Sequence, residues 1–231
     1  MENLEFIIPL LSALSSGAIG YYVRIYEVKK NETKLADKKF DKYSKRMWAS
    51  LKNLKFRLLY IQEQIIDTSK IQSIPNGKFS VEWCTKDGHF AVSTLYLFTY
   101  MSCIVNLYQK EVDFINFNSK SKTYQFYLLL ENLKKVITTN SVMWFHYFNG
   151  IGDYITNKKE NEPITFNEFV IKLKQDIDFF EFMNQSFYFI QFLFDTNTSS
   201  KYIKSINSEI SNLLCFIENN AIIPKIKYIE N

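Results

Sequence analysis

The feature that most constrains this chain is an uncharged run close to its N-terminus. Phe6 to Val23 contains 18 residues without a charged side chain. As an α-helix this run would be about 27 Å long, close to the ~30 Å hydrocarbon core of a bilayer. Glu2 and Glu5 precede it, and basic residues follow it from Arg24 onwards. Because basic residues favour the cytoplasmic side, the sequence predicts a single membrane span, with the N-terminus outside and the body in the cytoplasm.

Two alternatives to a membrane span remain open. A cleavable signal peptide is the weaker one, because its positive charge should precede the apolar stretch, although Ala18 to Gly20 resembles a small-residue cleavage site. The core helix of a soluble helical bundle can also be a long uncharged run.

One face of the predicted span is small and polar. Successive helical residues are 100° apart, so Glu5, Pro9, Ser12, Ser16 and Gly20 fall within a narrow arc. Small residues at this spacing let helices approach closely, which favours a homo-oligomer. The stripe is either a dimer packing seam or the lining of a pore around a shared axis, where a ring of Glu5 carboxylates would favour cations. A monomeric anchor is the remaining alternative.

Positive charge is concentrated directly after the span. Residues 29–57 contain eleven basic and three acidic residues, a net charge of +8 in a chain whose total is +4. Apolar residues recur there at alternating intervals of four and three, from Met47 through Leu51 and Leu54 to Ile65. This pattern predicts a long amphipathic helix from about Lys34 to Asp67, which would continue from the span as a stalk.

Anionic lipid headgroups and the positive-inside rule account for the first part of this charge. The later basic residues, with Tyr43 and Trp48 between them as stacking surfaces, are typical of a site for a nucleotide or a short oligonucleotide. The candidate ligand-binding residues are Lys38, Lys42, Lys45, Arg46, Trp48, Lys52, Lys55 and Arg57.

The rest of the chain predicts an all-α fold: an N-terminal transmembrane helix, a long basic amphipathic helix and a cytoplasmic helical bundle. Only 6 glycines and 4 prolines are available for tight turns. We expect three parts, residues 1–30, 31–70 and 71–231. A loop is expected at 67–89, a core helix at 90–108, a charged loop at 157–163, and a helix from 166 to 182 opened by a capping box of Thr165 and Glu168. Further helices are expected at 124–137, 142–155, 185–194 and 200–217.

No catalytic motif is present, so we expect no enzyme, no cofactor and no metal site. His89 and His146 are the only histidines and have no ligand spacing around them. The three cysteines lack CxxC spacing, and no arginine precedes a histidine in the RxxxxH pattern of HEPN-type ribonucleases. A cryptic helical enzyme, assembled around His89 by tertiary structure, is the third functional alternative.

Three segments are similar to an uncharacterised group of bacterial proteins that begin with one short apolar span and continue as a helical cytoplasmic region. They are HFAVSTLYLF at 89–98, EVDFI at 111–115 and WFHYFNGIG at 144–152. The resemblance covers about half of the chain and implies no activity. The organisation is also similar to that of membrane effectors of antiviral defence, whose oligomers form pores gated by a nucleotide or oligonucleotide from a partner enzyme. These resemblances imply a location in the bacterial inner membrane. We therefore expect a ligand-gated pore in contact with membrane lipids; the runner-up is a non-conducting, membrane-tethered binding or scaffold protein.

Overall fold

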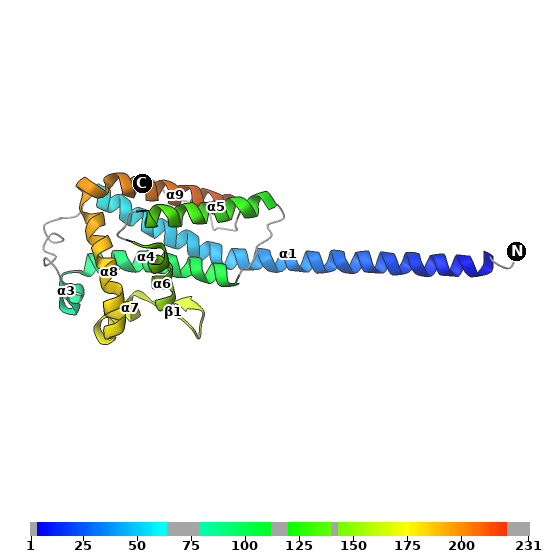
Figure 1. Ribbon diagram of the computed structural model, residues 1–231, viewed down its shortest axis with the longest axis horizontal. Coiled ribbons are helices and arrows are strands. Elements are labelled where there is room, and N and C mark those ends of the chain that lie inside the picture. Colours follow the sequence, from blue (N-terminus) through cyan, green and yellow to red (C-terminus); the bar gives the residue numbers. More distant parts are fainter. Residues whose placement is uncertain (1–3, 64–78, 112–119, 140–142, 221–231) are drawn as a thin grey trace, which may run out of the picture.

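A computed structural model of the chain describes residues 4–63, 79–111, 120–139 and 143–220. Within these ranges it also describes the side chains, except those of residues 4–18, 33, 36, 37, 39, 111, 120 and 145. The described part is helical apart from one two-stranded hairpin (Figure 1). The prediction of an all-α fold is confirmed.

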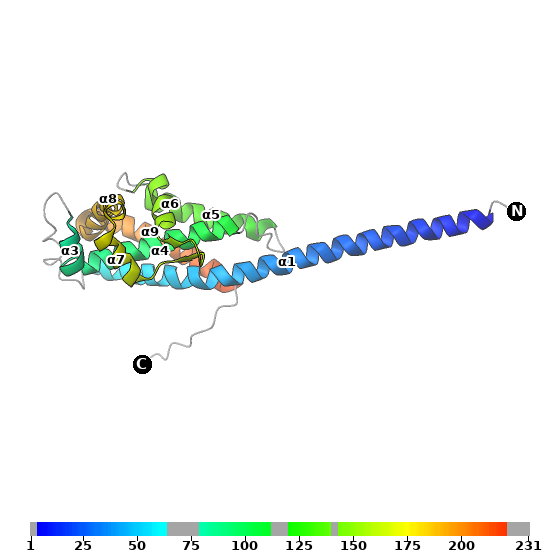
Figure 2. The same ribbon diagram turned by 90° about the horizontal axis from the view of Figure 1, so that it is seen from below.

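Helix α1 (Leu4–Gln62) is a single helix of 59 residues, about 88 Å long at 1.5 Å per residue. It crosses the expected boundary between span and basic helix without a break. Its N-terminal part projects from the body as a rod, and its C-terminal part lies within the body (Figures 1 and 2). The predicted apolar seam is confirmed, because Met47, Leu51, Leu54 and Leu58 are all buried.

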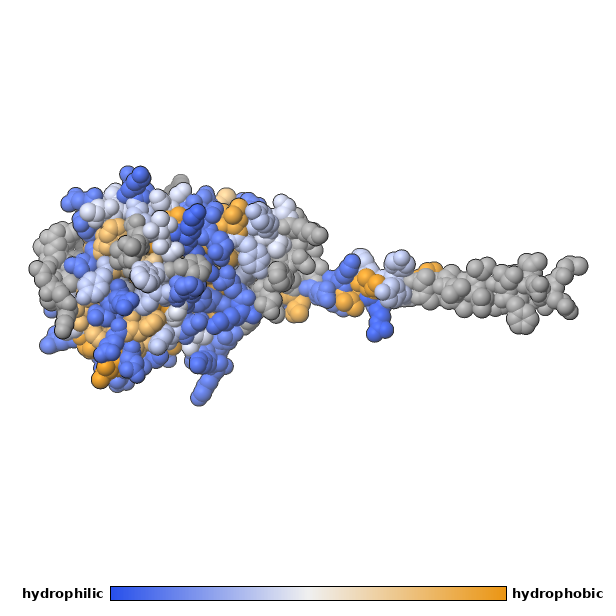
Figure 3. All heavy atoms as spheres, viewed as in Figure 1, coloured by the Kyte–Doolittle hydropathy of each residue, from blue (hydrophilic) through white to orange (hydrophobic). Residues whose placement is uncertain are grey.

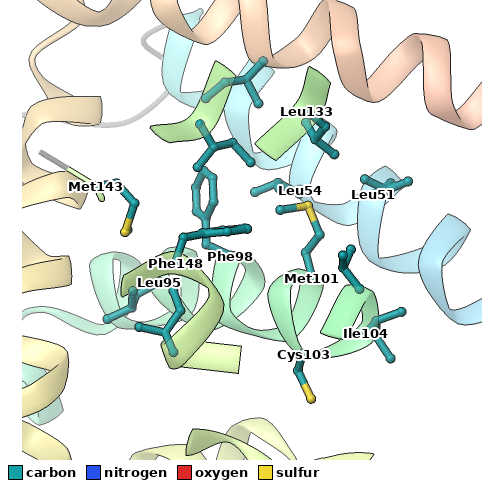
Figure 4. Packing of buried hydrophobic residues seen from close by; sticks show 14 of the residues in the cluster. Leu51, Leu54, Leu95, Phe98, Met101, Cys103, Ile104, Leu133, Met143 and Phe148 are labelled. Atoms are coloured by element: carbon teal, nitrogen blue, oxygen red, sulfur yellow. The ribbon is translucent and has the colours of Figure 1, made fainter. Parts of the chain in front are cut away.

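The body is built from shorter elements around the C-terminal half of α1. They are α3 (Val81–Lys86), α4 (His89–Glu111), α5 (Lys120–Thr138), α6 (Phe145–Tyr154), α7 (Phe166–Gln175), α8 (Ile177–Phe194), α9 (Thr196–Asn220), β1 (Thr156–Asn157) and β2 (Glu162–Pro163). Helices α4 and α9 pack against α1, α5 packs on α9, and α6 crosses α4. One hydrophobic core joins α1, α4, α5, α6, α8 and α9. Figure 4 shows part of it, with Leu54, Met101, Leu133 and Phe148.

Helix α4 contains the central apolar segment of the body. Among the described residues, His89–Lys110 is the one stretch long and apolar enough to cross a membrane, and 67% of its apolar window is buried inside the fold. Its polar side chains have partners there: the Ser102 hydroxyl donates to the Phe148 carbonyl at 2.6 Å, and the Asn106 amide donates to the Asn149 carbonyl at 2.7 Å. This burial agrees with the core helix expected at 90–108.

The structure differs from the sequence expectations at four places. The loop expected at 67–89 contains the short helix α3, and the separate helix expected at 185–194 is the C-terminal part of α8. The helix expected from 166 to 182 is broken at Asp176, whose side chain accepts a hydrogen bond from the Phe179 amide at 2.9 Å and caps α8. The charged loop expected at 157–163 contains the β1–β2 hairpin, in which Asn157 pairs with Glu162. The capping box is confirmed, since Thr165 and Glu168 each bond the backbone of the other.

Candidate functional site

The basic residues expected to bind one ligand do not share one face of α1. The buried seam covers one side of the helix, and the candidate residues are spread around the rest of its circumference. Lys38, Lys42 and Lys45 point outward and are exposed. Trp48, Lys52 and Lys55 lie toward α9, whereas Arg46 and Arg57 lie toward α4 and the hairpin. A small ligand cannot contact both arginines and Lys52 at once, because α1 stands between them.

The two arginines have structural partners. Arg46 forms an ion pair with Glu162 of β2, which fastens the hairpin to α1. Arg57 donates hydrogen bonds to the Ser93 hydroxyl at 2.9 Å and the Thr94 hydroxyl at 3.1 Å. Burial lowers the pKa of Arg57 from its usual value. Both side chains therefore hold α1 against its neighbours.

The three candidates on the α9 side line a groove between α1 and α9. Its volume is about 530 Å³, and it is lined from α1 by Trp48, Ala49, Lys52, Asn53, Lys55, Phe56 and Leu59, and from α9 by Ser211, Leu214, Cys215 and Glu218. Phe56 is 73% exposed, so a large apolar ring faces the solvent there. Of the eight candidate ligand-binding residues, the groove thus brings together Trp48, Lys52 and Lys55.

Two contacts fix the indole of Trp48 at the edge of the groove. Its Nε1 donates a hydrogen bond to Glu218 Oε1 at 2.7 Å, and Lys52 Nζ lies 4.2 Å from its ring centroid. These two contacts hold the indole in one orientation. Tyr43, the other expected stacking surface, is fully buried against Tyr108 and cannot contact a ligand.

The chemistry of the groove is amphipathic. Lys52 and Lys55 supply positive charge, Glu218 supplies one carboxylate, and Trp48 and Phe56 supply flat apolar surfaces. Such a lining suits a molecule with an aromatic ring and an anionic group, because the ring can stack while a lysine pairs with the charge.

Sequence reasoning did not find the α9 residues of this groove. No sequence motif marks Ser211, Cys215 or Glu218. They contact α1 only because α9 packs against it, although the two segments are about 160 residues apart in the sequence. The sequence alone can separate Arg46 from the lysines of the groove. Arg46 precedes Lys52 by six residues, and six steps of 100° place the two about 120° apart around the helix.

The part of α1 that precedes the body, from the last residues of the predicted span onwards, is exposed on all sides, and we call residues 19–35 the exposed stalk. Every side chain described between Ile19 and Leu35 is exposed except Ile25, which is half-buried. Tyr21, Tyr22 and Tyr26 are each at least 65% exposed. Hydrophobic and hydrophilic side chains are mixed along this part of the rod (Figure 3).

Of the expected pore-lining residues, only Gly20 has surroundings that the structure describes. The side chains of Glu5, Pro9, Ser12 and Ser16 lie outside the described part of the structure. Gly20 is described, and a Cβ added to it would meet no atom within 4 Å. In a single copy of the chain, the stalk is therefore open at Gly20.

Around His89 the described residues gather no obvious catalytic group. His89 is exposed and its ring packs 5.5 Å from that of Phe166, while the nearby Ser93 hydroxyl donates to the Phe90 carbonyl. Burial raises the pKa of Cys84 to about 12 and that of Cys103 to about 11, so neither thiol is a ready nucleophile. No group of three His, Cys, Asp or Glu residues in the described ranges could hold a metal ion.

A second hollow, which the sequence did not predict, lies among α3, α7 and α8. Its volume is about 390 Å³ and its lining is mainly apolar, including Phe79, Leu173, Ile177 and Tyr188.

Comparisons with protein-family models, curated proteins and solved structures give no significant match to this chain.

Proposed function

We propose that this protein is an oligomeric effector of the bacterial inner membrane, whose first helices form a small cation pore controlled by an anionic ligand. The observation that carries the proposal is the continuity of α1, which runs as one helix from the predicted span into the buried core. A ligand bound at the groove contacts the same helix that would line the pore.

The exposed stalk supports the membrane part of the proposal. Burying one large apolar side chain is worth about 1.5–3 kcal/mol, and the stalk leaves Ile19, Tyr21, Tyr22 and Tyr26 in solvent. Lipid or a second copy of the chain would cover these side chains. Tyrosines next to basic residues are typical of the membrane interface, which supports a span ending near Val23 with the N-terminus outside.

The pore part is supported by the sequence of the span. Ser12, Ser16 and Gly20 form a small, polar stripe, and Glu5 would place carboxylates at the outer mouth. Parallel copies in contact through this stripe would enclose a hydroxyl-lined path that favours cations.

Control by a ligand requires two packings of α1 with different affinities for that ligand. The groove supplies a plausible basis, because it is formed by α1 and α9 together, so a shift of one helix against the other changes the spacing of Lys52 and Glu218. We propose a nucleotide or a short oligonucleotide from a partner enzyme as the ligand. The similarity in organisation to pore-forming effectors supports a role in antiviral defence. The proposal includes no catalytic step.

Ion flux into liposomes tests this function. Full-length protein is reconstituted and flux is measured with and without candidate nucleotides. We expect ligand-dependent flux, and we expect replacement of Ser12 and Ser16 by leucine to abolish it without loss of insertion. Ala18→Leu is the matched control, because residue 18 lies on the opposite side of the helix from Ser16. Ion gradients that stay intact under every condition would exclude the pore.

The second candidate function is a non-conducting, membrane-tethered binding protein. The neighbouring exposed side chains of Phe56 and Leu59 in the groove favour it, because a contiguous apolar patch is typical of contacts with protein partners. Replacing Lys52 and Lys55 by glutamine separates the two functions. Loss of nucleotide binding with unchanged lipid association supports the ligand site, whereas a wild-type protein that associates with lipid but binds no nucleotide supports the tether. Arg46 is unsuitable for this test, because its replacement also breaks the ion pair with Glu162.

A further inference from the structure

The outward face of α1 continues the polar stripe of the predicted span. Ser12, Ser16 and Gly20 lie 36 residues before Trp48, Lys52 and Phe56. Thirty-six residues are about ten turns of an α-helix, so each member of the stripe stands on the same side as its counterpart, about 54 Å away. Helix α1 runs between them without a break (Figures 1 and 2).

Most of the body lies on the other side of this helix, and α9 borders the outward face at Trp48 and Lys52. The buried seam residues Leu51 and Leu54 are about 100° and 200° away from Lys52 around α1. If spans associate in parallel through the polar stripe, the bodies are therefore carried on the outside of the assembly. The groove and the outward face of α1 then point toward the neighbouring copies.

This outward face is strongly positive. Lys34, Lys38, Lys45 and Lys52 lie within a narrow arc of it, with Asp41 among them, whereas Glu5 and Glu27 lie in the same arc on the N-terminal side of the lysines. The last three lysines follow one another at seven-residue intervals, about 10 Å along the helix. Parallel copies would bring these rows of lysines together, and like charges that approach each other oppose the association.

We infer that a polyanion binds between copies of the chain, on the lysine row of α1, and stabilises the association of their cytoplasmic halves. This inference rests on the proposed function and deepens it, because it makes the ligand site a shared one. The ligand carries several phosphate groups, which can pair with lysines from more than one copy. Trp48 and Phe56 lie beside the row and can stack with a base if the ligand has one.

Cysteine cross-linking in lipid nanodiscs tests this inference with inorganic tripolyphosphate as the probe. The full-length Cys215→Ser variant is the background, since Cys84 and Cys103 are buried. Phe56→Cys reports contact between the cytoplasmic faces, and Gln185→Cys, at an exposed position on α8, is the control. We expect tripolyphosphate to increase cross-linking severalfold at Phe56→Cys but not at Gln185→Cys, whereas sulfate at equal ionic strength has no such effect.

Lysine variants identify the site. Lys45→Gln combined with Lys52→Gln should abolish the increase at Phe56→Cys. Lys158→Gln combined with Lys159→Gln removes the same charge from the exposed hairpin turn and should preserve it. The inference is overturned if tripolyphosphate leaves cross-linking at Phe56→Cys unchanged, or if the increase survives loss of Lys45 and Lys52.

Gly20→Cys separates this inference from the proposed function. Cross-linking at Gly20→Cys together with none at Phe56→Cys contradicts the shared site and leaves association of the spans intact. Absence of cross-linking at both positions contradicts the oligomeric assembly as well.

Discussion

Replacing Gly152 by alanine tests how closely α6 crosses α4. A Cβ on Gly152 would lie 2.7 Å from the Cys103 backbone nitrogen, 2.7 Å from Ser102 Oγ and 2.8 Å from the Ser102 carbonyl carbon. Two of these atoms belong to the backbone of the central helix and cannot rotate away. The added methyl group would push α6 off α4 and strain the hydrogen bond from Ser102 to Phe148.

The expected loss of stability follows from three opposing effects. Overpacking costs about 1–3 kcal/mol, and weakening one buried hydrogen bond costs ~1 kcal/mol. Alanine recovers ~1 kcal/mol through its higher helix propensity. The net free energy of unfolding should fall by about 1–3 kcal/mol, which lowers the midpoint of thermal unfolding by about 2–12 °C for a domain of this size.

Far-ultraviolet circular dichroism of the full chain in detergent measures this midpoint. Gly150→Ala is the matched control in the same helix, because its Cβ would meet only the end of the Phe182 ring, at 3.4 Å. That variant should unfold at the wild-type temperature or slightly above it. Equal stability of the two variants would refute the close crossing of α4 and α6.

Three further predictions follow from other parts of the structure. Thr165→Ala should destabilise the fold by ~1 kcal/mol through loss of the α7 cap. The backbone amide and the hydroxyl of Thr165 both donate hydrogen bonds that lower the pKa of Glu168, and loss of the hydroxyl should raise that pKa part of the way to its usual value. Because that pKa is lowered by folding, the stabilisation from Glu168 is present at neutral pH and is lost as the pH falls through the folded-state pKa, which NMR titration can follow. Arg57→Ala should cost about 2 kcal/mol through loss of its charged hydrogen bonds to α4, whereas Lys55→Ala on the other side of α1 should change the unfolding midpoint in urea very little. Gly20→Leu should leave the thermal stability of the body unchanged, since nothing lies within 4 Å of Gly20, but should reduce the oligomer size measured by sedimentation in detergent; an unchanged size would contradict packing through this residue.

Much of the helical fold could be predicted from local sequence patterns. The seam of α1 was visible because Met47, Leu51 and Leu54 recur at helical spacing, and the same spacing is what buries them. The capping box of α7 was visible because a threonine followed three residues later by a glutamate satisfies two backbone amides at once. Both features depend on residues within a few turns of each other.

The break at Asp176 was missed because two signals compete there. Apolar residues continue at helical spacing from Phe169 through Leu173 to Phe180, which favours one unbroken helix. The carboxylate of Asp176 accepts from the Phe179 amide instead and starts a new helix. Short polar side chains often bond the backbone in this way, and the periodicity of their neighbours does not reveal it.

The candidate site was predicted only in part, because its shape depends on tertiary packing. Lys52, Lys55 and Trp48 were recognised by charge and aromatic character, and they do line one groove. Nothing in the local sequence indicates that Glu218 would meet Trp48. The hairpin was missed because its charged residues are typical of a loop and its two strands, of two residues each, are too short to show an alternating pattern. The ion pair of Glu162 with Arg46 joins segments 116 residues apart and has no local signal.

The central proposal is that α1 connects a membrane-spanning oligomer to the helical bodies. Single-particle imaging of the full-length protein in lipid nanodiscs tests it most directly. We expect several copies whose first helices cross the bilayer side by side around one axis, with the bodies carried on the outside and the groove facing inward. A full-length protein that is monomeric and soluble in aqueous buffer without detergent would contradict this proposal.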